Sequence, residues 1–428
     1  MIQKPKGTYD LYGKQGKICK ELEKIMNALM ENYNYEFIRT PNFESSLLFH
    51  RGVGETTDIV SKETYDFIDR GNRDMTLRPE GTAGVVRSYI ENKMYGDVIN
   101  PRKLWYYGPM YRYERPQSGR FREFYQFGVE VFGTKSPYMD AEVISIPVNF
   151  YRLLGLKDIK VHINTLGDTE SRKKYKEALL TYFKPYINDL CDDCKERFEK
   201  NPLRILDCKI DGNKEIMKNA PNIIDYLNEE SKIHFENLKK ALDSLKIEYV
   251  IDTNLVRGLD YYTHTVFEVE ANIGGKEIAL CGGGRYDNLV ENIGGPSTPG
   301  VGFALGIERL FAILEQENIN ILENEKIDIY IIPMGTMDYS VALANSLRMN
   351  GFITEIDYMN RKIGNNFKQA DRMNAKFIII IGEEEQQSNI LTVKNNHTKE
   401  EYKVDIKDLI DFLDDNLDDC ECEECSHE

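Results

Sequence analysis

Hydrophobic residues near the start of the chain recur at intervals of three and four. The pattern runs from about Gly16 to Asn32 and includes Ile18, Leu22, Ile25, Met26 and Leu29. This spacing places the apolar side chains on one side of an α-helix. We therefore expect an amphipathic helix that packs its apolar side against a sheet.

A different pattern, alternation with a period of two, runs from Lys103 to Gly133 on both sides of the polar connection ERPQSGR. It predicts a long antiparallel hairpin. On the second strand, one face would carry Tyr125, Phe127, Val129 and Val131, and the opposite face Phe124, Gln126, Gly128 and Glu130. The first face is expected to be core. The second, with Met110, Arg112 and Glu114 from the first strand, fits either a nucleotide site or a solvated face with cross-strand ion pairs.

The hydrophobic pattern also divides the chain into domains. It becomes helical and charged from Ser171 to about Lys246, which predicts an inserted helical module, and strand-like segments resume at 247–251, 262–269 and 277–280. A second α/β region starts near Lys326, where IDIYIIP and AKFIIIIG are typical of buried strands. We expect a first domain of residues 1–325 with its insertion at about 171–246, a second of 326–413, and a disordered acidic tail of 414–428.

Composition narrows the class of protein. The chain has 428 residues, a formal charge of −16 and eight unevenly spaced cysteines, which are more typical of reduced thiols than of a disulfide framework. We find neither a signal-peptide pattern nor an apolar run of membrane-spanning length, so we expect a cytoplasmic protein without a membrane partner. The tail supplies eight carboxylates, and any contact with RNA would have to use basic patches such as residues 112–122.

A second candidate for phosphate binding lies at GVGFALGIERL, residues 300–310. It predicts a strand that ends at Gly306 and a helix that begins near Ile307, with Arg309 in the first turn beside the positive end of the helix. The glycine spacing departs from G-x-G-x-x-G, and the chain has no G-x-x-x-x-G-K-[ST] loop. Arginines would therefore have to hold a triphosphate.

These segments carry a family resemblance. Residues 111–124 (YRYERPQSGRFREF) resemble motif 2 of class II aminoacyl-tRNA synthetases in its histidyl form, residues 300–310 resemble motif 3, and residues 37–44 resemble motif 1. LVRGLDYYT (255–263) and CGGGRYD (281–287) are similar to two segments peculiar to histidyl-tRNA synthetases. The resemblance covers Met1 to about Leu413. It implies an α+β catalytic domain, built on the class II antiparallel sheet flanked by helices, with a helical insertion and a C-terminal α/β anticodon-binding domain.

The resemblance also implies an activity and its residues. The activity is that of a histidine–tRNA ligase, which uses ATP and Mg²⁺ to activate L-histidine, transfers it to the 3′ end of tRNA(His), and forms a homodimer through motif 1. The implied catalytic residues are Arg112, Arg257 and Arg309. Those for ATP are Arg112, Glu114, Arg120, Phe124, Arg257 and Arg309, and Gln117 would approach the tRNA acceptor end. Those for histidine are Glu80, Gly81, Thr82, Gln126, Glu130, Tyr261, Tyr262 and Tyr286.

Two alternative functions have to be weighed. Non-catalytic, synthetase-like regulatory subunits of histidine biosynthesis share the catalytic fold, but they lack the anticodon domain and have eroded motifs. Here Arg112, Arg257, Arg309 and a C-terminal domain are all present, which favours the enzyme. The other alternative is a class II synthetase for a different amino acid, which activity with other amino acids would reveal.

The cysteines leave the question of a metal open. Cys191-x-x-Cys194 and Cys208 could supply three zinc ligands, but the sequence indicates no fourth, and we expect no zinc site there. Cys420, Cys422, Cys425 and His427 form a complete ligand set within the tail. Acidic tails are usually solvated and disordered, so metal binding by the tail is the less favoured interpretation.

Overall fold

The structure is a computed structural model that describes residues 1–54, 57–116, 119–208, 210–212, 214–259, 261–322 and 327–417. The chain forms two compact units, the first from Met1 to Ile321 and the second starting at Leu322. The tail residues Cys420, Cys422, Cys425 and His427, and also Gln117, lie outside the described residues.

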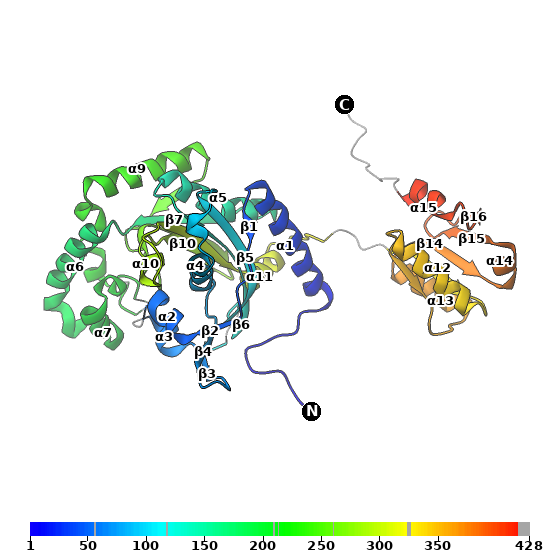
Figure 1. Cartoon of the computed structure of the whole chain (residues 1–428), viewed down its shortest axis with the longest axis horizontal. Helices are drawn as coiled ribbons and strands as arrows, with labels where there is room; N and C mark the ends of the chain where they lie inside the picture. The colour runs from blue at the N-terminus through cyan, green and yellow to red at the C-terminus, as the bar shows by residue number, and fades with distance from the viewer. Residues whose placement is uncertain are drawn as a thin grey trace. The chain divides into compact units, whose positions relative to one another are not determined.

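An eight-stranded sheet is the centre of the first unit (Figure 1). Its strand order is β1 (Glu36–Phe37), β5 (Arg102–Tyr111), β6 (Glu123–Phe132), β11 (Gly300–Gly306), β10 (Lys276–Arg285), β9 (Thr263–Ile273), β7 (Ile159–Thr165) and β8 (Tyr249–Ile251). All neighbouring strands from β5 to β7 in this order pair antiparallel, whereas β1 with β5 and β7 with β8 pair parallel. The expected class II α+β sheet is thus confirmed, and each of its two edge strands, β1 and β8, pairs parallel with its neighbour.

The two faces of the β5–β6 hairpin differ as predicted. Phe127, Val129 and Val131 are fully buried in the main hydrophobic core, together with residues from α1 (Gly13–Asn32) and α5 (Pro137–Leu153). The predicted helix near the N-terminus is confirmed and begins three residues earlier than the pattern indicated. Sequence patterning did not predict α5, because it is apolar on most sides and contains Pro147, which is unfavourable inside a helix.

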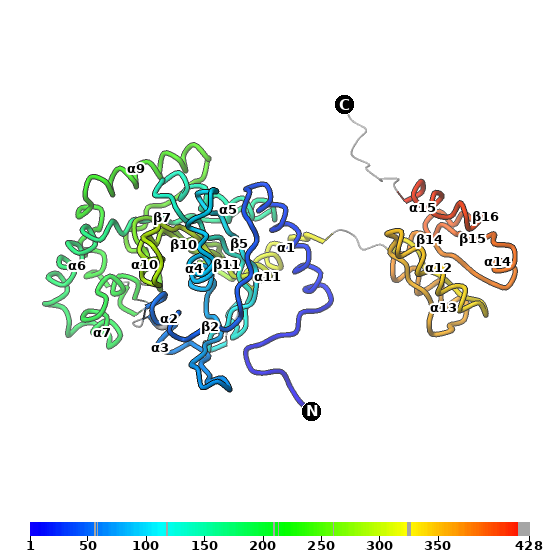
Figure 2. The backbone as a smooth tube through the Cα atoms, viewed as in Figure 1, coloured from blue at the N-terminus to red at the C-terminus, as the bar shows by residue number. Residues whose placement is uncertain are grey.

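The inserted module between β7 and β8 is helical (Figure 1) and can be followed as the green tube in Figure 2. Asp168 and Asn228 cap its two long helices, since their side chains accept hydrogen bonds from the backbone N–H groups of Ser171 and Ser231 at 2.8 and 2.9 Å. The elements are α6 (Thr169–Phe183), η2 (Lys184–Asp189), α7 (Asp192–Lys200), η3 (Pro202–Ile205), α8 (Glu215–Lys218), η4 (Ile223–Tyr226) and α9 (Glu229–Ser244).

Shorter elements complete the first unit. A small antiparallel sheet has the order β2 (Phe43–Ser45), β4 (Asp74–Leu77), β3 (Tyr65–Ile68). The helices are α2 (Ser46–Val53), α3 (Asp58–Lys62), α4 (Thr82–Glu91), η1 (Met94–Gly96), α10 (Leu289–Asn292) and α11 (Ile307–Gln316). The predicted passage from strand to helix at Gly306 is confirmed.

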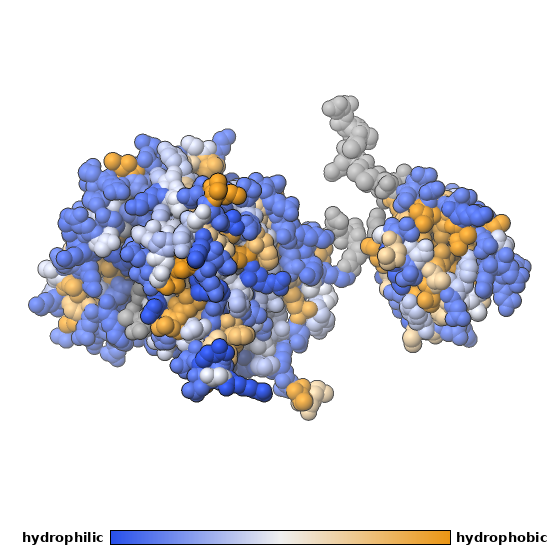
Figure 3. Space-filling view, in the orientation of Figure 1, coloured by the Kyte–Doolittle hydropathy of each residue, from blue (hydrophilic) through white to orange (hydrophobic). Residues whose placement is uncertain are grey.

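The second unit has its own sheet, in the order β13 (Thr354–Ile356), β12 (Ile327–Pro333), β14 (Ala375–Ile381), β15 (Ile390–Asn395), β16 (Glu401–Asp405). Both predicted buried strands, β12 and β14, lie at its centre. The helices are α12 (Met337–Met349), α13 (Ile363–Arg372), α14 (Glu383–Ser388) and α15 (Leu409–Leu417). None of the described helices is long and apolar enough to cross a bilayer, and much of the face seen in Figure 3 is hydrophilic.

Candidate active site

A cavity of about 700 Å³ opens on the face of the large sheet opposite the main core. The described residues bring together twelve of the side chains named from the sequence, which come from β6, the connection between β5 and β6, the start of α4, the loop before β9, the end of β10 and the first turn of α11. They are Glu80, Thr82, Arg112, Glu114, Arg120, Phe124, Gln126, Arg257, Tyr261, Tyr262, Tyr286 and Arg309.

Four guanidinium groups converge on this cavity, those of Arg112, Arg120, Arg257 and Arg309. Burial and the nearby charge of Arg120 lower the pKa of Arg309. Cations that repel one another in a partly buried space are stabilised by an anion that lies among them. The cavity is therefore suited to a polyphosphate.

Phe124 and Glu114 lie beside these cations. The guanidinium carbon of Arg112 is 5.2 Å from the centre of the Phe124 ring, and Arg112 Nε donates to the carbonyl oxygen of Pro79 at 2.8 Å. Glu114 pairs with Arg120 Nη1 at 3.3 Å and lies 3.8 Å from Arg112 Nη1. A flat apolar ring between a fixed cation and a carboxylate is typical of a purine site next to a phosphate site.

Arg257 is fixed by the sheet below it. It forms an ion pair with Glu268 of β9, and a Cβ atom at Gly282 of β10 would collide with its guanidinium group. Burial alone would lower the pKa of Arg257, but the charge of Glu268 raises it. Arg257 is thus a permanent cation, held above a position where only glycine leaves room for it.

Glu130 lies under the aromatic part of the cavity. It accepts hydrogen bonds from the Tyr286 hydroxyl and, at 2.7 Å, from Thr82 Oγ1. Burial raises the pKa of Glu130 to about 8, although both hydrogen bonds act to lower it. Burial therefore favours the protonated form of this carboxyl group. Glu130 lies directly below Tyr286 and Thr82, which line the cavity.

The remaining polar groups of this part differ in how free they are. Gln126 Oε1 is buried and has no hydrogen-bond partner among the described residues. Both carboxylate oxygens of Glu80, in contrast, accept backbone N–H groups at the start of α4, from Thr82 at 2.8 Å and Ala83 at 2.9 Å. The rings of Tyr261, Tyr262 and Tyr286 pack against one another, with centroid distances of 4.7 and 5.6 Å. A ligand that donates a hydrogen bond would satisfy Gln126.

Two of the residues predicted for histidine lie beneath the cavity and do not line it. Glu130 is 1% exposed, and its contacts reach the cavity only through Thr82 and Tyr286. Gly81 packs under Tyr106, where a Cβ atom would collide with the ring. Glycine at position 81 therefore leaves room for the Tyr106 ring. The sequence motif does not reveal this packing role.

One wall of the cavity was not predicted from the sequence. Asp193, Arg197, Arg204, Asp207, Cys208 and Ile210 of the inserted module line it. Their pattern is that of a charged helical surface, and only the fold brings them beside Arg257. Glu268 was also missed, because it is recognised as the partner of Arg257 only when the β9–β10 register is known.

Comparison with known proteins follows the same division into two units. The family model described as histidyl-tRNA synthetase matches residues 7–310, and the model described as anticodon binding domain matches residues 328–416. The histidine–tRNA ligase of Anoxybacillus flavithermus is 52% identical over 416 residues, which cover 96% of this chain and 98% of that protein. The histidine–tRNA ligase of a Geobacillus species is 51% identical over 420 residues, 97% of this chain and 99% of that protein.

Solved structures give the same result. The crystal structure of apo histidyl-tRNA synthetase from Staphylococcus aureus has a TM-score of 0.82 and 45% sequence identity, and the match covers 96% of this chain and 100% of that one.

Proposed function

The chain belongs to the histidyl-tRNA synthetase family, and we propose that the cavity on the large sheet is where it forms histidyl-adenylate. As a histidine–tRNA ligase it activates L-histidine with ATP and transfers it to the 3′ end of tRNA(His). The regulatory-subunit alternative is not favoured, because histidine–tRNA ligases match both units of this chain at about 50% identity.

ATP would occupy the half of the cavity that contains the arginines. Adenine would stack on Phe124 and donate from its amino group to Glu114, while Arg112 and Arg257 would hold the α-phosphate from opposite sides. Arg309 would bind the γ-phosphate from the first turn of α11. The convergence of these cations supports the assignment, because negative charge shifts along the triphosphate as the histidine carboxylate attacks the α-phosphorus and pyrophosphate leaves.

Histidine would occupy the aromatic half. The imidazole would meet the hydroxyls of Tyr262 and Tyr286, the latter held by Glu130. The α-amino group of histidine would meet Gln126 Oε1, which has no hydrogen-bond partner in the described part of the chain. Thr82 and Glu80 lie at the same side. The hydroxyls of Tyr262 and Tyr286 line the cavity and can each donate to or accept from an imidazole nitrogen, so the pocket rejects side chains that leave these groups unpaired.

Magnesium would enter with ATP. Magnesium sites commonly use one or two carboxylates and take their other oxygens from phosphates and water, so with Glu114 assigned to the adenine amino group the ion would be held mainly by phosphate and water oxygens. Among the described residues, no group of three ligating side chains lies on the nucleotide side of the cavity. When bound, the ion would neutralise charge on the phosphates.

For tRNA, we propose contacts with both units. Arg120, and Gln117 from the same loop, would approach the acceptor end, and the second unit would bind the anticodon.

Motif 1 would form a dimer: Phe37, Phe43, Leu47 and Ile68 are exposed on or beside edge strand β1 and the small sheet. Sedimentation should give a dimer that Phe43→Asp dissociates, while Ile233→Asp, at an exposed apolar position on α9, has no effect. The cytoplasmic location stays a prediction.

The observation that carries the assignment is the set of four guanidinium groups and three tyrosines in one cavity, with the buried carboxyl of Glu130 beneath it. Its test is exchange of labelled pyrophosphate into ATP. Exchange should require histidine, should not occur with the other amino acids, and should fall on substitution of the cavity arginines. Histidine-dependent exchange that survives loss of both Arg112 and Arg257 would place the reaction elsewhere.

A further inference from the structure

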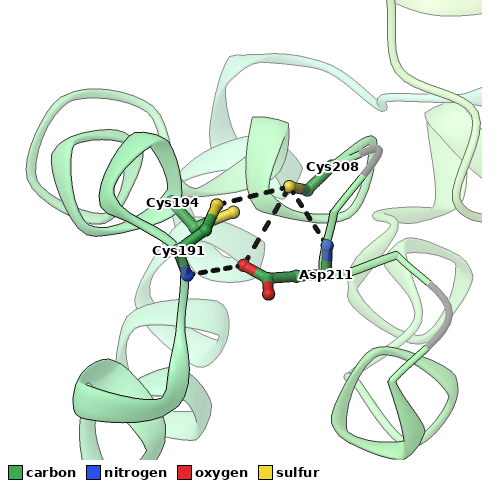
Figure 4. A group of neighbouring side chains, drawn as sticks. All are labelled: Cys191, Cys194, Cys208 and Asp211. Carbon is green, nitrogen blue, oxygen red and sulfur yellow. Dashed lines mark hydrogen bonds between the residues drawn. The ribbon is translucent and has the colours of Figure 1, made fainter.

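Four potential metal ligands of the inserted module lie together (Figure 4), and one of them, Cys208, also lines the wall of the cavity that this module forms. Cys191 is the N-cap of α7 and Cys194 lies in its first turn, whereas Cys208 and Asp211 follow η3. One ligating atom from each residue lies within 4.8 Å of all the others. The sequence indicates three possible ligands here, and the fold brings Asp211 beside them as a possible fourth.

The distances fit a tetrahedral ion. Zinc–sulfur bonds of about 2.3 Å place two sulfur ligands roughly 3.8 Å apart, and Cys191 Sγ lies 3.6 Å from Cys208 Sγ. Asp211 Oδ2 lies 4.0 Å from Cys208 Sγ. A disulfide requires sulfurs about 2.05 Å apart, so Cys191 and Cys208 would have to move to form one, and Cys194 and Asp211 would remain unused.

The surroundings hold the four groups as ligands. Cys194 and Asp211 are fully buried and Cys208 nearly so. The backbone N–H of Asp211 donates to Cys208 Sγ at 3.4 Å, and that of Cys191 donates to Asp211 Oδ2 at 2.8 Å. Lys214 Nζ lies 2.7 Å from the other carboxylate oxygen, so Oδ2 can face an ion while Oδ1 keeps its cation. Backbone N–H groups and one lysine would offset part of the negative charge of the ligand set.

We propose that Cys191, Cys194, Cys208 and Asp211 bind one Zn²⁺ ion. Three soft sulfur ligands favour zinc over magnesium or calcium, and four protein ligands form a closed structural site with no position left for a catalytic water. The ion would join α7 to the segment after η3. Because Cys208, Ile210, Arg197 and Arg204 also line the catalytic cavity, it would hold that wall in place.

The test is metal content, which does not depend on the activation of histidine. The reference protein is the full chain with Cys420, Cys422 and Cys425 changed to serine, which removes the thiolates of the tail. Purified under reducing conditions, it should retain about one zinc ion per chain after dialysis against a weak chelator, and cobalt substitution should give the absorption of a tetrahedral thiolate complex. In the same background, Cys194→Ser and Cys208→Ser should lose the ion, and Asp211→Asn should weaken binding at least tenfold.

Cys19→Ser is the matched control, since Cys19 is another buried thiol and belongs to α1. It should retain the ion. Should a ligand variant fail to fold, a strong chelator applied to the reference protein should remove one zinc and make residues 184–214 sensitive to protease. A reference protein without stoichiometric zinc and without the cobalt–thiolate spectrum would overturn the proposal, as would a mapped Cys191–Cys208 disulfide. These metal measurements do not depend on histidine-dependent exchange, so they test the zinc site separately from the proposed function.

Discussion

Replacement of Arg257 by alanine is the substitution with the most defined consequence for activity. Arg257 faces the cavity and forms an ion pair with the carboxylate of Glu268. Removal of one donor that stabilises developing charge typically costs about 2.7–4 kcal/mol of transition-state stabilisation, or roughly 10²–10³ in rate. The substitution also leaves Glu268 without its cation beside the phosphates. At an effective dielectric constant of about 20, repulsion over several ångströms adds on the order of 2–3 kcal/mol.

The two contributions can be separated by a second substitution. Arg257→Ala should slow formation of histidyl-adenylate by roughly 10³-fold or more, the loss of the donor and the exposed carboxylate acting together. In Arg257→Ala/Glu268→Gln the carboxylate is neutral, so about 10–10² of the rate should return. Glu268→Gln alone should lower activity less than Arg257→Ala, because the cation remains.

The assay is single-turnover adenylate formation with saturating histidine and ATP, with histidine affinity measured separately by equilibrium binding. Binding should change little, since Arg257 is assigned to the phosphate. Arg73→Ala is the control, because its guanidinium pairs with Asp69 on the surface and its side chain is 75% exposed. Near-normal adenylate formation by Arg257→Ala, or a double variant as slow as the single one, would refute this account of the residue.

Three further substitutions test other parts of the cavity. Gly282→Ala adds a Cβ atom that collides with the Arg257 guanidinium, so adenylate formation should fall at least tenfold in the single-turnover assay while ATP and histidine still bind. Phe124→Ala removes the proposed stacking surface for adenine, and the KM for ATP in pyrophosphate exchange should rise by roughly tenfold, about 1.4 kcal/mol, while the KM for histidine stays the same. Burial raises the pKa of Glu130 to about 8 from its ordinary value of 4.5, so the folded protein favours the protonated carboxyl group. The contribution of Glu130 to the free energy of unfolding is complete below about pH 4.5 and is lost as the pH rises through 8. Between pH 6 and pH 8 the wild type should lose roughly 2–3 kcal/mol of unfolding free energy that Glu130→Gln retains. Urea unfolding of both proteins at the two pH values measures this difference, and an equal loss in both would contradict burial as the cause of the shift.

The sequence predicted those parts of the fold that depend on local pattern. Alternation along β6 separated Phe127 and Val129, which are core residues, from Phe124 and Gln126, which line the cavity. Arg309 was placed correctly in the first turn of a helix. In each case, the period of the side chains fixes which face a residue occupies, without reference to the rest of the chain.

What the sequence did not predict depends on long-range placement. Gly282 lies opposite Glu268 in the β9–β10 register, so Arg257 can cross the glycine to reach the carboxylate, but no local pattern reveals this pairing. Asp211 was missed for the same reason: Cys208-x-x-Asp211 has the spacing of Cys191-x-x-Cys194, but only the fold brings the two pairs together.

The hollow in which the substrates are proposed to bind is a consequence of where the sheet carries glycine. Three central strands carry a glycine on the open face of the sheet: Gly128, Gly282 and Gly302. A Cβ atom at these positions would collide with the side chains of Tyr106, Arg257 and Glu130, respectively. Two of these side chains, Tyr106 and Glu130, belong to the directly paired position of the neighbouring strand, and the third, Arg257, reaches across from a loop. The positions of these groups are therefore fixed by strand register and core packing. A side chain introduced at such a glycine should displace the polar group before it disrupts the core on the other face, so activity should fall further than stability.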